Sequence, residues 1–370
     1  MKSNSEYSFI AIADVHLGAK LFNLPELAQD LKDAFSQAID KAVELKVSYF
    51  IVVGDLYEHN KPQPDLIQFV RFCLNRLKQA GIAPIGIAGD HDKPINGSAW
   101  VHISGFYHIN DDNNLGRFLG YDYTDNSPEN VQKIIDHPNK YLVEWIFLHG
   151  QVPELFAFCE EKKLLDLKKV DLIGLYPNLK GIVLGDIHKP YEGTIADPTM
   201  SRAAPPYIGY CGSLGIVRLD EVDHKIGLLY YDGQKLNRLP FKLDRDFYRV
   251  DVKDLFNPVT QLLEQYYKQY KGISGKKPVF LVESTKDSKD LLGKLSKLYE
   301  VAIVRSVVGR KDQKKEEVIN IRSELSTSNR VEEVLKELIG TDPDLLTLTL
   351  NLIKEEDPKR LLDTFKETSL

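Results

Sequence analysis

Two hydrophobic periods alternate along the first 245 residues of the chain. Short apolar runs bounded by glycine, proline or polar residues predict buried strands, and such runs lie at 7–13, 47–53, 83–88, 143–148, 181–184, 205–210 and 225–231. Apolar residues recur about every fourth position over 26–45 and 65–80, which predicts two amphipathic helices. The polar stretch 111–139 has no strong period and is expected to be a long connection with some helix. This order predicts an α/β core whose sheet is covered on both faces by helices or by a second sheet.

The pattern changes near Asp246. Residues 246–317 carry strand and helix signals in the order β-α-β-α-β, ending in a charged connector, which predicts a small αβ domain. Residues 318–370 are expected to be a linker and a helical tail, in which two helices open with Asp-Pro. The apolar side of the tail is too large for short helices to bury alone. It therefore docks either on the rest of the chain or on a partner.

Composition places the chain among ordinary globular proteins. Its 370 residues are 43% hydrophobic, enough for two or three packed units. No apolar run approaches the roughly 20 residues of a membrane helix, and the first residues lack the features of a signal peptide. The three cysteines, Cys73, Cys159 and Cys211, have no disulfide or zinc spacing and indicate a reducing compartment. We expect a cytoplasmic protein.

The charge is unevenly distributed. The net charge is −6, but residues 276–315 contain eleven Lys or Arg against five Asp or Glu, which makes this window +6 and the remainder −12. A basic module on an acidic body would hold a polyanion such as DNA near an acidic site that needs metal cations. A helix studded with solvated lysines explains the window equally well.

Carboxylates and imidazoles follow five of the predicted strands, mostly beside a glycine. In chain order they are Asp14 and His16, Asp55, Asp90 and His91, His149, and Asp186 and His188. Ligands at the carboxyl ends of α/β strands meet in one crevice. Any one of these residues alone would be explained as part of a turn, as a helix cap or as a polar group with its hydrogen bonds satisfied. The fivefold repetition predicts a shared site.

These side chains suit two divalent metal ions. Carboxylate with imidazole favours Mn, Fe or Zn over a calcium cage, and two ions about 3.5–4 Å apart activate water for in-line displacement at phosphorus. We assign three residues to a first subsite (Asp14, His16 and His188), three to a second subsite (Asp90, His149 and Asp186), and Asp55 to a bridging position. His91 is expected to protonate the leaving oxygen or to stabilise charge on the phosphoryl group.

The five motifs occur in the order DxH, GD, GNH[DE], H and GHxH of the calcineurin-like metallophosphoesterases, which the chain resembles. Within that superfamily, "DVHLG", "GDLYEHNKP", "GDHD", "LHG", "GDIHKP" and "YCGSLG" are similar to DNA-repair nucleases of the SbcD/Mre-eleven type. The resemblance implies a metallophosphoesterase β-sandwich flanked by helices, a small αβ cap domain and a helical tail. It also implies a manganese-dependent exo- and endonuclease that forms a homodimer. An ABC-ATPase of the SbcC/Rad-fifty type would bind to the tail.

Two ligand positions depart from the family pattern. Asp90 stands where the motif has Asn, and Asp186 stands where it has His. Both side chains can still coordinate a metal. The ligand set then carries about −4, which matches two divalent ions, and the added charge favours Mg²⁺ or Mn²⁺.

A third departure lies after Asp55, where the family often has a histidine three residues further on. Glu58 stands there and His59 follows. One hypothesis is that Glu58 orients His91 and raises its pKa. The other is that Glu58 points to solvent and His59 takes the role.

Other functions fit the same motifs. The chain could be a phosphodiesterase for nucleotides or other small molecules, or a catalytically weak scaffold that regulates an ATPase. The basic window and the tail argue against the first, and the retained oxygen ligands and His91 argue against the second. A homodimer is expected to form through 65–80 or through the region 96–108.

Overall fold

The computed structural model describes residues 7–21, 24–93, 103–109, 115–125, 127–153, 155, 159–167, 170–195, 204–250, 276, 279–283, 300–305 and 317–319. The chain divides into two compact units, which are described separately. The first comprises Met1–Asp246 with Lys271–Lys276, and the second comprises Phe247–Tyr270 with Lys277–Leu370.

The first unit contains a six-stranded sheet in the order β11-β10-β1-β2-β3-β4. Its strands are β1 (Phe9–Ile12), β2 (Tyr49–Val53), β3 (Ala83–Ile87), β4 (Tyr107–His108), β10 (Gly227–Tyr231) and β11 (Leu236–Pro240). Strands β1 to β4 pair in parallel, and β10 is antiparallel to β1. The parallel strands therefore point their carboxyl ends to one edge.

A second, five-stranded sheet has the order β5-β6-β7-β9-β8. Its strands are β5 (Phe118–Tyr121), β6 (Trp145–His149), β7 (Gly181–Gly185), β8 (Tyr191–Thr194) and β9 (Tyr207–Tyr210). All pairs are parallel except β8 with β9.

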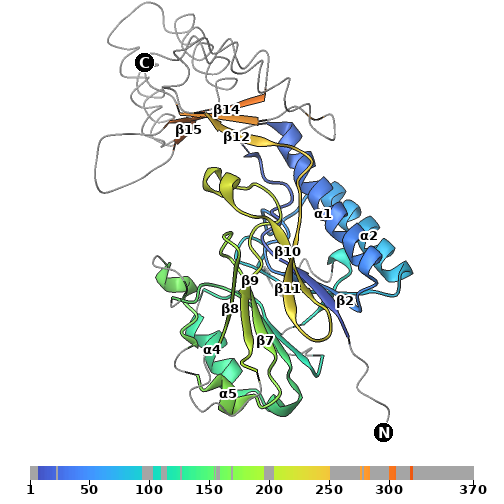
Figure 1. The fold of residues 1–370 in the computed structure, drawn as a ribbon, viewed down its shortest axis with the longest axis vertical. Helices are drawn as coiled ribbons and strands as arrows, with labels where there is room; N and C mark the ends of the chain where they lie inside the picture. Colours follow the sequence, from blue (N-terminus) through green and yellow to red (C-terminus); the bar gives the residue numbers. More distant parts are fainter. Residues whose placement is uncertain are drawn as a thin grey trace, which may run out of the picture. The chain divides into compact units, whose positions relative to one another are not determined.

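The two sheets pack face to face, and helices cover their outer faces (Figure 1). Side chains of β1, β2 and β3 meet those of β5, β6 and β7 in one buried cluster, where the rings of Phe9 and Trp145 lie edge to face at 4.9 Å. Alternate residues of β6 and β7 point to the opposite face and pack with α4 (Ser127–Asp136) and α5 (Leu172–Leu175). The first unit is thus a β-sandwich flanked by helices, as predicted.

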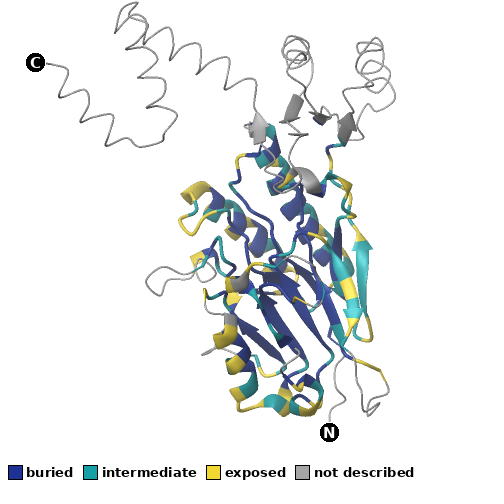
Figure 2. Ribbon diagram, turned by 90° about the vertical axis from the view of Figure 1, so that its left-hand side faces the viewer, coloured by how far each residue is buried: buried dark blue, intermediate teal, exposed yellow. Residues whose placement is uncertain are grey.

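Helices α1 (Pro25–Leu45) and α2 (Pro64–Gln79) lie together beside the six-stranded sheet. Both begin with proline in the first turn, where a missing N–H costs no hydrogen bond. Each has an exposed side and a side buried against the sheet, which Figure 2 shows in yellow and dark blue. Short 3-10 helices occupy Lys140–Leu142, Glu161–Lys163 and Leu219–Asp223. None of the helices in the described part of the chain is long and apolar enough to span a membrane.

The seven predicted strands and two predicted helices of the first unit are present. The stretch 111–139 contains the predicted helix, α4, but also strand β5, so it is not simply a connection. Strand β5 is only four residues long, and all four are buried. Strands β4, β8 and β11 were not predicted, because β4 is two residues long and the other two have no fully buried face.

The second unit contains a sheet in the order β12-β13-β14-β15. Its strands are β12 (Phe247–Val250), β13 (Val279–Glu283), β14 (Glu300–Arg305) and β15 (Glu317–Ile319). The first three pair in parallel, as β-α-β units require, and β15 is antiparallel to β14. The helices predicted between these strands and those of the tail lie outside the described residues. Strand β15 crosses the boundary predicted at 317, and the three-domain division stays a prediction.

Candidate metal centre

The predicted ligands lie together at the carboxyl ends of the strands of both sheets. Asp14, Asp55 and Asp90 follow β1, β2 and β3, while His149 ends β6 and Asp186 follows β7. All seven predicted ligands, with His91, occur in groups of three whose ligand atoms lie within 4.8 Å of one another. The groups are Asp14, His16 and His188; Asp14, Asp55 and His149; Asp90, His149 and Asp186; and His16, Asp55 and His91.

The backbone is strained where it turns these side chains inward. Among the described residues, five non-glycine residues have a φ between 50° and 85°, and four of them are predicted ligands: Asp14, His16, Asp55 and Asp186. Residues held in this region cost free energy and cluster at functional sites. Glycines provide the remaining space, since a Cβ on Gly89 would lie 2.1 Å from Asp55 Oδ1 and one on Gly185 would lie 2.2 Å from the carbonyl oxygen of Val53.

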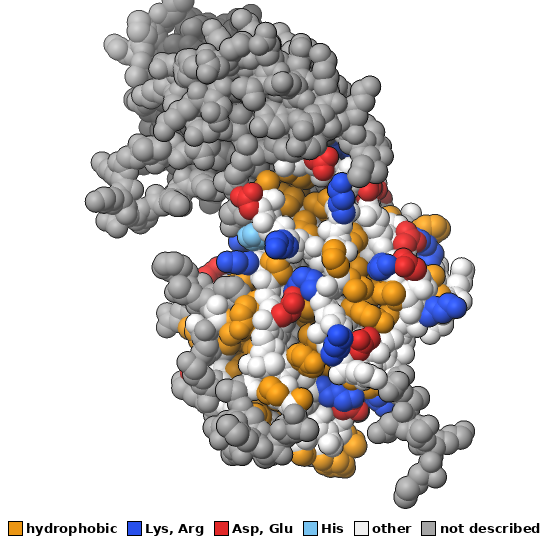
Figure 3. Space-filling view, viewed as in Figure 1, with side chains coloured by type: hydrophobic (Ala, Val, Ile, Leu, Met, Phe, Trp, Pro, Cys, Tyr) orange, Lys and Arg blue, Asp and Glu red, His pale blue; other side chains and the backbone are white. Residues whose placement is uncertain are grey.

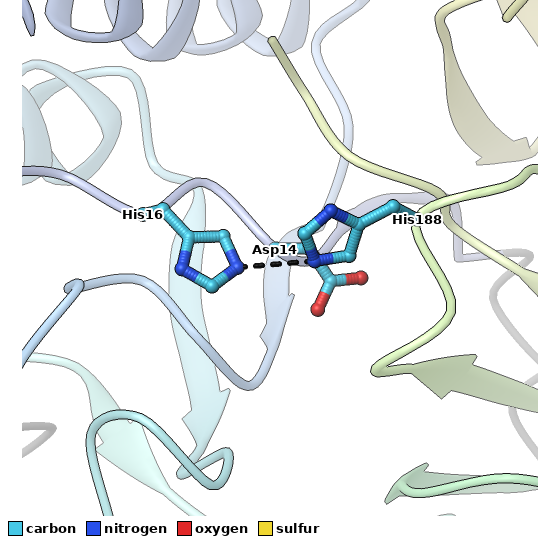
Figure 4. Close-up of side chains that lie close together, drawn as sticks. All are labelled: Asp14, His16 and His188. Atoms are coloured by element: carbon cyan, nitrogen blue, oxygen red, sulfur yellow. Dashed lines mark hydrogen bonds between the residues drawn. The ribbon is translucent and has the colours of Figure 1, made fainter. Parts of the chain in front are cut away.

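In the first subsite, two imidazoles present the same nitrogen to each other. His16 Nε2 and His188 Nε2 are 3.2 Å apart, as Figure 4 shows. The opposite nitrogen of each ring faces a carboxylate, Glu58 Oε2 at 2.8 Å from His16 Nδ1 and Glu221 beside His188 Nδ1. Because a carboxylate accepts a hydrogen bond, each Nδ1 carries the proton and each Nε2 presents a lone pair. Two such lone pairs at 3.2 Å are stable together only with a proton or a metal ion between them.

Asp14 supplies the third group of this subsite. Its Oδ1 accepts a hydrogen bond from the backbone N–H of Asp186 at 3.0 Å, whereas Oδ2 is buried with no hydrogen-bond partner among the described residues. Burial raises the pKa of the Asp14 carboxyl. An unsatisfied buried carboxylate oxygen beside two imidazole lone pairs fits a divalent cation. The residues of the first subsite therefore fit the metal that the motifs imply.

Asp55 lies between the two subsites. Its Oδ2 is 3.7 Å from His16 Nε2 and 3.4 Å from His149 Nε2, and its Oδ1 accepts the backbone N–H of His91 at 2.9 Å. Burial opposes its ionisation, but the charge and hydrogen bond of His149 lower the pKa of Asp55. This position fits the predicted bridging ligand.

The second subsite contains a lysine that the sequence did not predict. His149 Nδ1 donates to the carbonyl oxygen of Val53 at 2.9 Å, which turns Nε2 toward Asp90 Oδ1 at 3.3 Å. Lys163 Nζ lies 2.7 Å from Asp90 Oδ2 and 2.6 Å from Asp186 Oδ1. Burial opposes ionisation of Asp90, but His149 and Lys163 outweigh it and lower the pKa of Asp90. Two carboxylates of this subsite are thus already neutralised within the chain.

The surroundings of His91 differ from both hypotheses for its partner. His91 Nδ1 donates to the backbone carbonyl of Glu58 at 3.0 Å, while the Glu58 carboxylate is 3.7 Å away and lies closer to His16. Glu58 is partly buried rather than turned to solvent, and His59 is exposed. Residue 58 therefore orients His91 through its backbone, and its side chain serves mainly His16.

Motif reasoning missed the residues that support the ligands. Glu221 comes from the 3-10 helix Leu219–Asp223 and has no motif around it. Gln151 Nε2 donates to Asp186 Oδ2 at 2.5 Å. Lys163 lies in the charged run "EEKKLLD", which is typical of a solvated surface. The run carries no sequence signal that separates the buried Lys163 from the exposed Lys162.

Comparison with known proteins supports the class that this fold and site define. Residues 7–190 match the model of the calcineurin-like phosphoesterase family, and this stretch includes all seven predicted ligands. Residues 7–190 form a calcineurin-like phosphoesterase domain.

Several sequence relatives share one name. The chain is similar to the DNA double-strand break repair protein Mre11 of Sulfurisphaera tokodaii, at 45% identity over 91 residues, which cover 24% of this chain and 23% of the relative. For Mre11 of Archaeoglobus fulgidus the identity is 29% over 195 residues, which cover 51% of this chain and 42% of the relative. For Mre11 of Haloferax volcanii the identity is 28% over 215 residues, which cover 55% of this chain and 44% of the relative. The matches span less than half the length of these relatives.

Proposed function

We propose that the chain is a metal-dependent phosphodiesterase that cleaves DNA, using manganese in preference to magnesium. The observation that carries this proposal is the first subsite, where the Nε2 atoms of His16 and His188 face each other at 3.2 Å beside the unpaired Oδ2 of Asp14. These residues and Asp55 would hold a divalent ion, which would supply a Lewis acid and would lower the pKa of a nearby water molecule.

The other residues of the site have roles that follow from their contacts. His91 is partly exposed, and its Nδ1 donates to a backbone carbonyl, so the doubly protonated form of the ring would give its Nε2 proton to the leaving oxygen. Glu58 and Glu221 fix the protons of His16 and His188 on Nδ1. The sequence-based form of the proposal has two ions, with Asp55 bridging. The second subsite differs from the first because it contains Lys163.

The DNA substrate is supported by the relatives, which are named for double-strand break repair. On the face shown in Figure 3, acidic and basic side chains of the described residues are interspersed rather than separated into patches. Lys276, the first residue of the predicted basic window, bonds to Asp30 and Asp33 of α1. Its charge is therefore used within the first unit, and DNA binding by the window rests on its other residues.

The proposed assembly is a homodimer with an ABC-ATPase of the Rad-fifty type. Exposed apolar side chains on and near α2, Phe72, Ile103 and Tyr107, support a dimer contact in the predicted region. Arg71 and Lys78 of α2 hold the carbonyl oxygens of Ile103 and Gly105 and keep the two segments together. The proposed ATPase contact lies in the tail, outside the described residues.

Degradation of labelled duplex DNA in Mn²⁺, in Mg²⁺ and in a chelator tests this function, with His91→Ala as the matched inactive variant. The proposal predicts cleavage in Mn²⁺ that the variant loses while it still binds metal. Hydrolysis of bis-nitrophenyl phosphate without cleavage of DNA would favour a small-molecule phosphodiesterase. Failure on both substrates would favour a scaffold.

A further inference from the structure

We infer that the Lys163 ammonium takes the place of the second metal ion, so that this centre holds one divalent ion beside a fixed positive charge. The inference rests on the proposed function, because it concerns the same site, and it replaces the two-ion form of that proposal.

The carboxylate oxygens that a second ion would need already have partners within the chain. Lys163 Nζ contacts both carboxylates that a second ion would need, Asp90 Oδ2 at 2.7 Å and Asp186 Oδ1 at 2.6 Å. The remaining oxygen of Asp186 accepts Gln151 Nε2 at 2.5 Å. A divalent ion here would compete with a cation at hydrogen-bond distance from its own ligands.

The two subsites differ in whether their carboxylates have a cationic partner within the chain. The first has a buried carboxylate oxygen without a partner, on Asp14, and two imidazole nitrogens that face each other. No cationic side chain occupies this subsite among the described residues, and Asp14 Oδ2 has no hydrogen-bond partner there. In the second, each carboxylate has a lysine partner before any ion is added. One subsite is therefore built for an ion and the other for an ammonium group.

Lys163 is held in this position by burial of its side chain and by backbone hydrogen bonds. The side chain is only 10% exposed. Its backbone carbonyl accepts the N–H of Gln151 at 2.8 Å, its N–H donates to Glu160 at 2.9 Å, and Leu165 N–H donates to Gln151 at 2.7 Å. Gln151 lies two residues after His149, the predicted ligand at the end of β6, so the lysine is tied to the same strand end. A surface lysine that entered the site by chance would have no such anchoring.

The two departures from the family motif are the two partners of this lysine. Asp90 and Asp186 replace an amide and an imidazole of the pattern. An aspartate at each position supplies an anionic partner for an ammonium group, which neither Asn nor neutral His would do. The three residues Asp90, Lys163 and Asp186 therefore form one coupled unit.

The ammonium can do part of what a second ion would do. It keeps a positive charge in the crevice, and the two aspartates take two of its three N–H donors. The third can donate to a phosphoryl oxygen of the substrate. A lysine is a point charge suited to this contact.

The experiment counts metal without using substrate. The full chain is loaded with excess Mn²⁺ and desalted, bound manganese is measured by mass spectrometry of the elements, and the electron paramagnetic resonance spectrum is recorded. We expect one Mn²⁺ per chain, with the six-line spectrum of an isolated ion. Lys163→Met is expected to bind two and to give an exchange-coupled spectrum. The control Lys162→Met, which removes the same charge from an exposed neighbour, is expected to bind one.

Two ions per chain in the unchanged protein, or a coupled spectrum from it, would overturn the inference, and so would a folded Lys163→Met that still binds one. If Lys163→Met does not fold, the unchanged protein alone decides. One bound ion without DNA cleavage would contradict the proposed function and leave this inference standing. Two bound ions together with DNA cleavage would contradict this inference and leave the proposed function standing.

Discussion

At the scale of single residues, the chemistry of the centre depends on which atom each side chain leaves unsatisfied. His16 and His188 each give Nδ1 to a glutamate and keep Nε2 for the site. His149 gives Nδ1 to a backbone carbonyl with the same result. These outer partners fix the tautomers, so their loss is expected to weaken metal binding by about 10- to 100-fold.

Glu221→Gln tests this at a buried position. The amide no longer favours the Nδ1 proton of His188, so Nε2 becomes a poorer ligand. We expect the Mn²⁺ affinity, measured by calorimetric titration, to fall about 10-fold or more. The matched control Glu129→Gln changes an exposed glutamate on α4 and should leave the affinity unchanged. Equal affinities for the two variants would show that Glu221 is only structural.

Glu58→Gln and His59→Gln form a second pair. Because Glu58 bonds to His16 while His59 is exposed, Glu58→Gln should lower both Mn²⁺ affinity and turnover severely. His59→Gln should reduce turnover only mildly. Mn²⁺ titration and DNA cleavage rates measure both effects, and the reverse ranking would contradict the assigned roles.

Sequence reasoning worked at this scale where the ligand and its glycine are neighbours in the chain. The seven predicted ligands lie in short motifs at strand ends, so their grouping follows from the fold. Lys163 and Glu221 reach the site through tertiary packing instead. Nothing in the charged run around Lys163 shows that it is buried while Lys162 is exposed.

At the scale of elements, the site depends on two sheets whose strands end together. A polar cluster ties the opposite, amino ends of four strands. Glu144, before β6, accepts Tyr7 Oη at 2.6 Å and Lys180 Nζ at 2.7 Å, and Arg117 lies over the Tyr7 ring at 4.3 Å. Tyr7 precedes β1, and Lys180 precedes β7, so the cluster links the two sheets.

The pH dependence of stability should reflect this cluster. Burial opposes ionisation of Glu144, but Lys180 and Tyr7 lower its pKa. A depressed carboxyl pKa contributes stability above the unfolded value of about 4.3 that is lost as pH falls through the folded value. Glu144→Gln should therefore cost about 1 kcal/mol at pH 7, reduced by the partial exposure of Lys180. The difference in free energy of unfolding, measured in urea, should shrink below pH 4, and a constant difference would contradict this assignment.

The exposed side of α2 is the surface proposed for self-association. Phe72 is 65% exposed on this helix, so Phe72→Asp should leave the unfolding transition nearly unchanged. It should weaken self-association about 10-fold or more if α2 forms the homodimer contact. Sedimentation equilibrium measures the effect, with the exposed helix position Glu44→Ala of α1 as control. An unchanged dimer would place the contact elsewhere.

Elements with a clear hydrophobic period were predictable from the sequence. Helix α1 and strand β2 have strong periods, and their expected and observed bounds differ by no more than two residues. Strand β5 was missed because four buried residues between polar neighbours carry too little pattern. Strand β8 was missed because its side chains alternate between partly buried and exposed.

At the scale of the whole molecule, the groups that would carry out catalysis lie in the first unit. The metal centre forms from residues 14 to 188, within the stretch that matches the phosphoesterase family. The central prediction is that this centre binds one divalent ion.

Anomalous diffraction from crystals soaked in Mn²⁺ tests that claim most directly. The account predicts a strong anomalous peak between Asp14, His16 and His188, beside Asp55, with the Lys163 ammonium between Asp90 and Asp186. Loss of the peak in Asp14→Asn crystals would tie it to these ligands. No peak at this position, with manganese bound elsewhere or not at all, would contradict the account.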